Sequence, residues 1–198
     1  MEYILASASP RRKELLKEVI AEFSVIPSAF DESSVAEGLT PKKLVETLAK
    51  GKATEVSVRE ENAGKTVLGS DTVVAFGKRI LGKPRDEREA VEMLRLLSGK
   101  KHHVYTGVCF AVTEKGVTRT ACAVDKTAVY FERLSDERIK EYVAGGSPMD
   151  KAGAYGIQDG GLVKKIKGSY TNVVGLPVER LKKLFEKVTK SNLKGWKV

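Results

Sequence analysis

The chain has 198 residues, of which 41% are hydrophobic and 31% charged; this composition fits one globular domain and excludes disordered and fibrous proteins. No stretch of ~20 apolar residues and no basic leader are present, so we expect neither a membrane span nor a secretion signal, and we expect a cytoplasmic protein. The chain has only two cysteines, so we expect free thiols. It has two histidines and no CxxC pair, so any bound metal is expected to be a hard cation held by carboxylate oxygens.

The formal net charge is +9, which favours a polyanionic partner such as nucleic acid or phosphate. This charge is unevenly distributed. Residues 180–198 hold seven Lys or Arg and one Glu, so this segment carries +6 and the rest of the chain only +3. The body of the protein is therefore expected to be mildly basic.

Apolar runs predict strands at residues 3–6, 23–27 and 66–76, the last with a hairpin partner at 79–81. Helices are predicted to begin at the Ser-Pro pair of residues 9–10 and at the Thr-Pro pair of residues 40–41. In each pair the first residue can cap the helix, and proline suits the first helical position.

Further along, helical spacing follows Asp86 and Ser135, both suitable caps. Two long strands, at 103–113 and 118–131, are predicted around a turn at 114–116, with the histidines as polar residues entering the first. Residues 149–161 are Gly-rich and irregular, residues 162–166 and 171–174 predict a hairpin, and an amphipathic helix follows Pro177. This mixture favours a mixed α/β sheet.

The first candidate site is the segment Ser7-Ala8-Ser9-Pro10-Arg11-Arg12-Lys13. A helix N-terminus carries about +0.5 of a charge, so cations in the first turn are disfavoured unless an anion compensates. Serine hydroxyls, backbone N–H groups and two guanidiniums together can bind phosphate. The alternative is a solvated basic turn in which Ser9 only caps the helix.

The second candidate is Asp71, which lies between the apolar runs 66–68 and 73–76. A carboxylate within an apolar strand is costly unless it is hydrogen-bonded, bound to metal or at the lip of a cleft. Such a group can bind Mg²⁺ or accept a proton from an attacking water. The alternative is a solvent-facing position on an edge strand.

Four isolated residues are weaker candidates. Glu32 is a possible second metal carboxylate, Lys52 and Lys83 are possible phosphate ligands, and Gln158 can read a base edge through its paired donor and acceptor. For each of them, an ordinary solvated surface role is the competing interpretation.

Taken together, these segments resemble the Maf family, named for septum formation. The resemblance rests on LASASPRRKELL at residues 5–16, LGSDTVV at 68–74, LGKPR at 81–85, MLRLLSG at 93–99 and DKAGAYGIQ at 150–158. The segments occur in the family's order and spacing, so the similarity covers nearly the whole chain up to about residue 184.

The resemblance implies a Maf/inosine-triphosphatase-like α/β fold, with a single domain over residues 1–198 whose two lobes flank a central cleft. It also implies a homodimer and a nucleoside triphosphate pyrophosphatase that releases a nucleoside monophosphate and pyrophosphate. The combination of Arg11, Thr72 and Gln158 resembles the branch that acts on dTTP and UTP. Ser70 and Asp159 depart from that branch, where Ala and Gly are usual, and the charge of Asp159 is expected to alter pyrimidine selectivity.

The resemblance further marks Asp71 as the proton acceptor, and it marks these residues as members of the site: Ser7, Arg12, Glu32, Lys52 and Lys83. Ser9 joins them through its place in the phosphate turn. In the expected mechanism Glu32 and Asp71 hold Mg²⁺ or Mn²⁺, and water attacks the α-phosphorus. The competing hypothesis is a nucleic-acid-binding or cell-division regulatory protein that acts through a basic C-terminal extension at residues 187–198.

Overall fold

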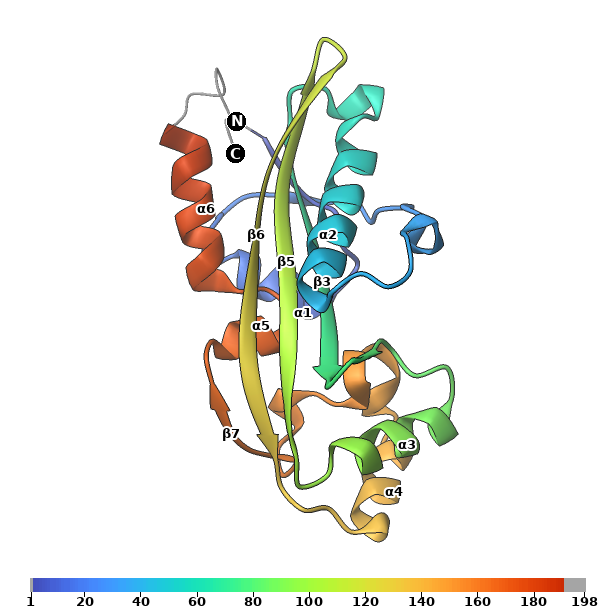
Figure 1. Cartoon of the computed structure of the whole chain (residues 1–198). Helices are drawn as coiled ribbons and strands as arrows, with labels where there is room; N and C mark the ends of the chain where they lie inside the picture. The colour runs from blue at the N-terminus through green and yellow to red at the C-terminus, as the bar shows by residue number, and fades with distance from the viewer. Residues whose placement is uncertain (1, 191–198) are drawn as a thin grey trace. The chain divides into compact units, whose positions relative to one another are not determined.

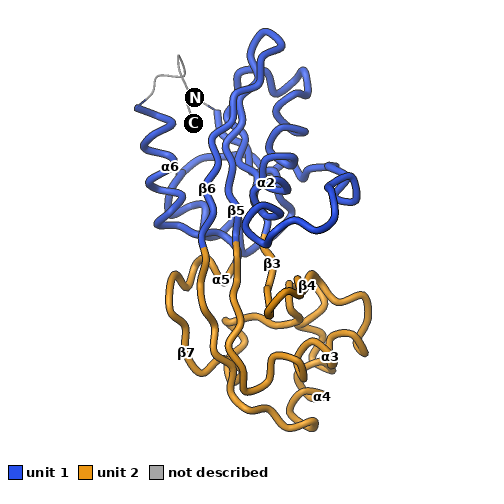
Figure 2. Tube along the Cα trace, in the orientation of Figure 1, with its two compact units in different colours: residues 1–71, 106–125, 175–198 blue, residues 72–105, 126–174 orange. Residues whose placement is uncertain are grey.

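The computed structural model describes residues 2–190 (Figure 1). These residues divide into two compact units (Figure 2): unit 1 comprises 2–71, 106–125 and 175–190, and unit 2 comprises 72–105 and 126–174. Hydrogen bonds order the strands as β2-β1-β3-β5-β6-β7, with β4 beside β3. Parallel and antiparallel pairs both occur, which confirms the predicted mixed α/β fold.

Three long strands pass through the division and contribute to both units; they are β3 (Thr66–Phe76), β5 (Lys101–Glu114) and β6 (Val117–Phe131). The other elements of unit 1 are β1 (Tyr3–Leu5), α1 (Pro10–Leu16), β2 (Ser24–Val25), η1 (Glu32–Ser34), α2 (Pro41–Ser57), η2 (Glu60–Asn62) and α6 (Val178–Lys190). Unit 2 contains β4 (Arg79–Leu81), α3 (Glu87–Leu97), α4 (Asp136–Ala144), η3 (Ser147–Asp150), η4 (Ala152–Ala154), η5 (Ile157–Asp159), β7 (Val163–Lys167) and α5 (Tyr170–Val174).

The strands of unit 1 are covered by helices on both faces. Successive side chains of a strand point to opposite faces. Val67 of β3 accordingly packs in the cluster that contains Ala49 of α2, whereas Leu68 packs in the cluster that contains Leu16 of α1 and Leu181 of α6. A polar residue on β3 that points to the α2 face therefore meets α2 directly.

The core of unit 2 lies between its strands and the helices α3 and α4. It contains Leu94 and Leu97 of α3, Ile139 of α4 and Phe131 of β6, all almost fully buried. Tyr155, from the irregular Gly-rich segment, packs in the same cluster. The irregular segment is thus attached to the core through an aromatic side chain.

The predicted helix caps are confirmed. The side chains of Ser9, Thr40, Asp86 and Ser135 each accept a hydrogen bond from the backbone N–H three residues later. Such caps satisfy backbone donors that a helix start leaves unpaired. Local sequence therefore sets where these helices begin.

The predicted hairpin partner at 171–174 is wrong, because residues 170–174 form the short helix α5. Ser169 Oγ accepts a hydrogen bond from the Asn172 N–H at 3.2 Å, which is the geometry of an N-cap. Asn172 is fully buried and donates to Val104 O and Thr127 Oγ1 at 3.1 and 3.0 Å. These two contacts with neighbouring strands replace the predicted strand pairing.

The prediction of free thiols is also wrong, because Cys109 and Cys122 form a disulfide. Their strands β5 and β6 form a hairpin whose turn residues Lys115 and Gly116 have φ of 49° and 75°. Positive φ at both positions is typical of the type I′ turn, which connects directly paired antiparallel strands. The turn thereby places Cys109 and Cys122 opposite each other on the two paired strands.

Among the helices that the structure describes, none has the length and apolar character that crossing a bilayer requires. The basic extension predicted at 187–198 lies mostly outside the described residues, which end at residue 190.

Candidate functional site

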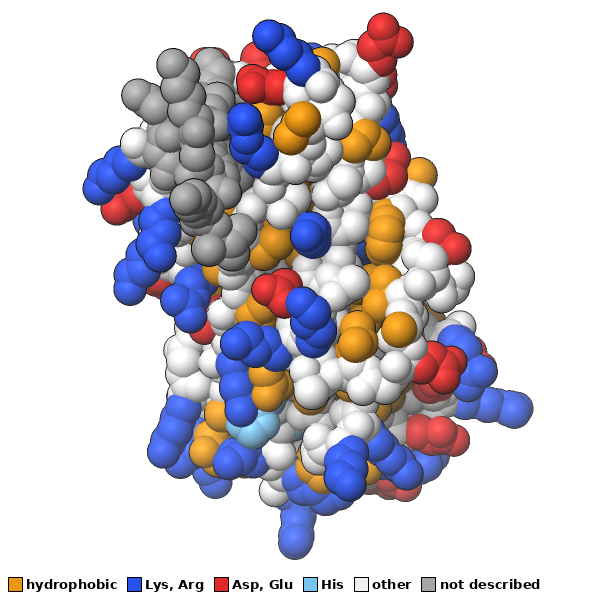
Figure 3. Space-filling view, turned by 45° about the horizontal axis from the view of Figure 1, so that its top comes forward, with side chains coloured by type: hydrophobic (Ala, Val, Ile, Leu, Met, Phe, Trp, Pro, Cys, Tyr) orange, Lys and Arg blue, Asp and Glu red, His pale blue; other side chains and the backbone are white. Residues whose placement is uncertain are grey.

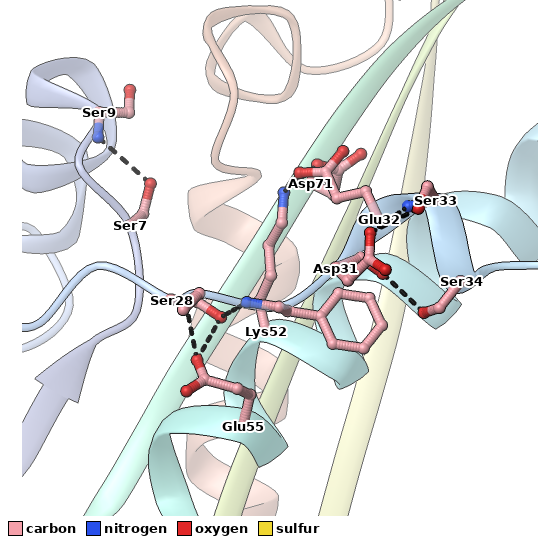
Figure 4. A network of polar contacts seen from close by, with 12 residues as sticks. Ser7, Ser9, Ser28, Asp31, Glu32, Ser33, Ser34, Lys52, Glu55 and Asp71 are labelled. Carbon is pink, nitrogen blue, oxygen red and sulfur yellow. Dashed lines mark hydrogen bonds and ion pairs between the residues drawn. The ribbon is translucent and has the colours of Figure 1, made fainter.

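The predicted carboxylate, Asp71, lies near the middle of β3 and points to the face covered by α2. The residue is 8% exposed, so its charge requires a partner. That partner is Lys52 of α2, whose Nζ lies 2.6 Å from Asp71 Oδ1 (Figure 4). The alternative of a solvent-facing position on an edge strand is wrong, because β3 lies between β1 and β5, and the role of Asp71 as proton acceptor stays a prediction.

The same ammonium group contacts a second predicted residue. Lys52 Nζ lies 2.7 Å from Oε1 of Glu32, which belongs to η1. Only 14% of the Lys52 side chain is exposed, against 57% for Glu32. One cation thus joins an enclosed carboxylate on β3 to a solvent-accessible one, and this leaves the trio with one net negative charge.

Glycine allows α2 to approach the sheet closely at this point. A Cβ at Gly69 would lie 2.2 Å from Ala49 O and 2.7 Å from Ala53 N, both in the backbone of α2. No real Cβ tolerates such contacts, so any side chain here would push α2 away from β3. Because Lys52 and Asp71 stand on these two elements, the spacing at Gly69 sets their distance.

The loop that carries Glu32 is tied to α2 by residues that sequence reasoning did not single out. Glu55 Oε2 accepts hydrogen bonds from Ser28 Oγ at 2.7 Å and from Ala29 N at 2.9 Å. Burial would raise the pKa of Glu55, but hydrogen bonds, first from Ser28 and then from Arg59, outweigh it and lower the pKa. Glu55 is therefore a stable acceptor that fixes the loop.

Asp31, one residue before Glu32, also fixes this loop through hydrogen bonds. Its Oδ1 accepts from the Ser33 N–H at 3.0 Å and from Ser33 Oγ at 2.6 Å, and it caps the turn η1. Hydrogen bonds from the side chain and backbone of Ser33 lower the pKa of Asp31. The signal for this role was present in the sequence as the acidic residue two positions before a serine.

The N-terminal segment of basic and serine residues is arranged around Arg12. Arg12 Nε donates to Gly175 O at 2.9 Å, and its Nη1 donates to Ser7 Oγ at 3.3 Å. Ser7 Oγ also accepts from the Ser9 N–H at 3.3 Å, and Ser9 Oγ caps α1. Burial lowers the pKa of the Arg12 guanidinium, whereas the charge of Asp71 raises it. The guanidinium therefore lies within electrostatic reach of the β3 carboxylate.

Ser70 takes part in the same arrangement, which sequence reasoning did not predict. It is fully buried, and its Oγ donates to Gly175 O at 3.3 Å. This carbonyl also accepts from Arg12 Nε. Ser70 thus connects β3, which bears Asp71, to the carbonyl that orients Arg12. An alanine, the residue expected at this position from the family resemblance, has no hydroxyl and cannot make this contact.

The predicted site residues are divided between the two units. Unit 1 contains Ser7, Ser9, Arg11, Arg12, Glu32, Lys52 and Asp71. Within it, Lys52 forms ion pairs with both Glu32 and Asp71. Burial is the main cause that lowers the pKa of Arg12, and repulsion from the charge of Arg11 lowers it further.

The other predicted site residues belong to unit 2. Thr72 follows Asp71 on β3, Lys83 is exposed between β4 and α3, and Gln158 is exposed in η5. Their roles toward a substrate stay predictions.

The described residues contain no group of three or more His, Cys, Asp or Glu side chains suited to a metal ion. Glu32 and Asp71 nevertheless supply two carboxylates, both within 2.7 Å of the Lys52 nitrogen. Mg²⁺ commonly binds one or two carboxylates and takes its other ligands from water and substrate phosphates. Glu32 and Asp71 supply the donor type that such an ion uses, but in the structure the Lys52 ammonium group bridges them, and their role as metal ligands stays a prediction.

The charge pattern gives no support to the nucleic-acid alternative. On the face shown in Figure 3, Lys and Arg side chains are interspersed with acidic and apolar ones. The segment on which that alternative depends lies mostly outside residues 2–190.

A family model and two named relatives support the enzyme hypothesis. Residues 2–188 match the family model described as "Maf-like protein". A dTTP/UTP pyrophosphatase of Clostridium novyi is 47% identical over 189 residues, which cover 93% of this chain and 96% of that protein. One from Bacillus cereus is 49% identical over 180 residues, covering 90% and 91%. The structure of a HAM1 protein from Coxiella burnetii aligns with 15% identity, a TM-score of 0.45 and coverage of 96% and 99%.

Proposed function

This chain belongs to the Maf family, and from that premise we propose that it is a nucleoside triphosphate pyrophosphatase that hydrolyses dTTP and UTP. The relatives with that activity in their names share about half of its residues over nearly the full length. The observation that carries the proposal is the enclosed Lys52–Asp71 pair, with the partly buried Arg12 within electrostatic reach of Asp71. A carboxylate and several cations in one place suit hydrolysis of a phosphoanhydride.

In the proposed reaction, a water oxygen forms a bond to the α-phosphorus. The bond from that phosphorus to the oxygen bridging the α- and β-phosphates breaks, and pyrophosphate leaves with the electron pair. Asp71 accepts the proton that the water loses. The products are dTMP or UMP and pyrophosphate.

The proposed role of the cationic residues is to stabilise the negative charge of the phosphates. Arg12 is oriented by Gly175 O and Ser7 Oγ, so its guanidinium is fixed before substrate arrives. We assign Arg11, Lys52 and Lys83 to the triphosphate oxygens, where positive charge stabilises the departing pyrophosphate. Preorganised charges cost no reorganisation during the reaction, and each is typically worth a factor of about 10²–10³ in rate.

The proposed cofactor is Mg²⁺ or Mn²⁺, held by Glu32 and Asp71. When bound, such an ion neutralises phosphate charge and polarises the α-phosphorus. We assign recognition of the pyrimidine to Thr72 and Gln158, since the Gln158 amide presents one donor and one acceptor to a base edge. We further propose that the enzyme is a homodimer and acts in the cytoplasm, where its substrates are used.

The decisive experiment incubates the protein with dTTP, UTP, CTP, GTP and ATP in the presence of Mg²⁺ or Mn²⁺ and separates the products by anion-exchange chromatography. We expect monophosphate without diphosphate, with dTTP and UTP turned over fastest. In water enriched in ¹⁸O, the label should enter the monophosphate, because attack at the α-phosphorus places the water oxygen there. Label in pyrophosphate, or no turnover with either metal, would refute the proposal.

Asp71→Asn tests the assigned proton acceptor, because asparagine preserves the shape and removes the basic oxygen. We expect kcat to fall by about 10³-fold or more. Asp136→Asn, at an exposed position of α4, is the matched control and should keep the wild-type rate. Light scattering of the purified protein tests the homodimer.

A further inference from the structure

The carboxylate of Asp159 is the centre of a hydrogen-bond network within unit 2. Its Oδ2 accepts from the hydroxyl of Tyr142 in α4 and, at 2.6 Å, from Oγ of Ser147 in η3. Burial would raise the pKa of Asp159, but the hydrogen bonds from Ser147 and Tyr142 and the charge of Lys151 lower it. The group is therefore an ionised acceptor directed toward its own unit.

The network extends to the backbone of the segment that contains Asp159. The Gly156 N–H donates to Tyr142 Oη at 2.9 Å, and Lys151 Nζ donates to Ser147 Oγ at 3.0 Å and to Ser147 O at 2.5 Å. A Cβ at Gly156 would lie 2.7 Å from Asp159 Oδ2 and 2.8 Å from Lys151 Cε. The side chains thus close over the Gly156 backbone, and a Cβ there would displace the ends of Asp159 and Lys151.

The preceding residue is anchored independently. Tyr155 is 5% exposed, its hydroxyl lies 2.8 Å from His102 Nε2, and its ring packs edge-on against Phe131. Residues 155 and 159 therefore fix the two ends of a short segment. Between them, the exposed side chain of Gln158 makes no hydrogen bond to any described residue and is available to a ligand.

We propose that Asp159, together with Tyr142 and Ser147, is a set of positioning residues that holds Gln158 for recognition of the pyrimidine base. This inference rests on the proposed function and deepens it. It differs from the expectation that the Asp159 charge acts on the base directly, because hydrogen bonds from Tyr142 and Ser147 already hold that carboxylate within unit 2. A group that orients a base-reading side chain contributes to binding and discrimination and leaves the attack on phosphorus unaffected.

The test compares Tyr142→Phe and Asp159→Gly with the wild type, using dTTP, UTP and CTP as substrates. We expect KM for dTTP and UTP to rise about tenfold, kcat to stay within about twofold, and the preference over CTP to shrink. Tyr130→Phe is the matched control, because no hydrogen bond of the Tyr130 hydroxyl occurs among the described residues. It removes a hydroxyl from the same unit and should change neither constant.

Two further measurements separate positioning from a general structural role. In a Gln158→Ala background, Tyr142→Phe should have almost no additional effect on KM, since the two changes act through one contact. Hydrogen exchange of the Gly156 amide should become faster in Tyr142→Phe, because that amide loses its acceptor.

The outcomes distinguish the two proposals. Faster exchange with unchanged KM and unchanged base preference would overturn this inference alone, as would full additivity with Gln158→Ala. Absence of triphosphate turnover by the wild-type protein would overturn the proposed function and this inference together.

Discussion

The ammonium nitrogen of Lys52 lies 2.6 Å from Oδ1 of Asp71, and both side chains are almost excluded from water. An ionised carboxylate in such a place needs a fixed partner, because burial removes its hydration. Lys52 is that partner, and it comes from the helix that Gly69 allows to approach β3. The position of the proposed proton acceptor thus depends on one lysine and one glycine outside its own motif.

Replacing Lys52 by methionine keeps most of the side-chain volume and removes the charge. We expect kcat/KM for dTTP to fall by about 100-fold or more, because Asp71 loses its partner and the phosphates lose a cation. Lys50→Met, on an exposed position of the same helix, is the matched control and should behave like the wild type. Equal rates in both variants would contradict the assignment of Lys52 to the site.

Gly69→Ala tests the close approach of α2 to β3. The added Cβ would meet the Ala49 carbonyl at 2.2 Å, so we expect the free energy of unfolding in urea to fall by about 1–3 kcal/mol. Because the helix must shift, kcat/KM should fall as well. Gly82→Ala adds a methyl where no atom lies within 4 Å and serves as the control for stability. A fully stable Gly69→Ala would show that α2 adjusts without strain.

The sequence was sufficient to predict features that depend on local chemistry. The caps Ser9, Thr40, Asp86 and Ser135 were predictable because a cap needs only one suitable side chain before a helical stretch. Asp71 was predictable because a carboxylate is conspicuous in an apolar strand. Its contact with Lys52 was not, since spacing along the chain does not show which helix covers which face.

The roles missed from sequence depend on distant parts of the chain. Asp159 was noted from the sequence only for its charge, and its hydrogen bond with Tyr142 depends on the position of α4. Ser70 acquires its role only where Gly175 O accepts from both Ser70 and Arg12. The helix at 170–174 was missed because the buried bonds of Asn172 outweigh the β propensity of its neighbours.

The disulfide between Cys109 and Cys122 predicts a protein that depends on redox conditions. The cysteines are separated by 13 positions, and closing a loop of that size in the unfolded chain contributes about 3 kcal/mol at most. Reduction with a dithiol should therefore lower the urea midpoint of the wild type, while Cys122→Ala should be insensitive to reductant. Thiol titration of the denatured, unreduced protein should find no free thiol; two free thiols would contradict the structure.

His102 is 1% exposed and contacts Tyr155, and its Nδ1 atom has no hydrogen-bond partner among the described residues. It was predicted as a polar residue entering a strand, but it belongs to the aromatic core with Phe131. Burial lowers the pKa of His102 from 6.5 to about 4. The folded state therefore favours the neutral imidazole, whereas the unfolded chain takes up a proton near pH 6.5.

It follows that the stabilisation linked to neutral His102 is complete above about pH 6.5 and is lost as the pH falls from there toward 4. At pH 4 the expected loss is about 3 kcal/mol. Urea unfolding at intervals between pH 7.5 and 4 measures it as the difference between the wild type and His102→Gln, which has no imidazole to protonate at that position. His103→Gln, at the partly exposed neighbouring position, should keep most of the wild-type slope. Identical slopes for wild type and His102→Gln would show that His102 is not the group that titrates.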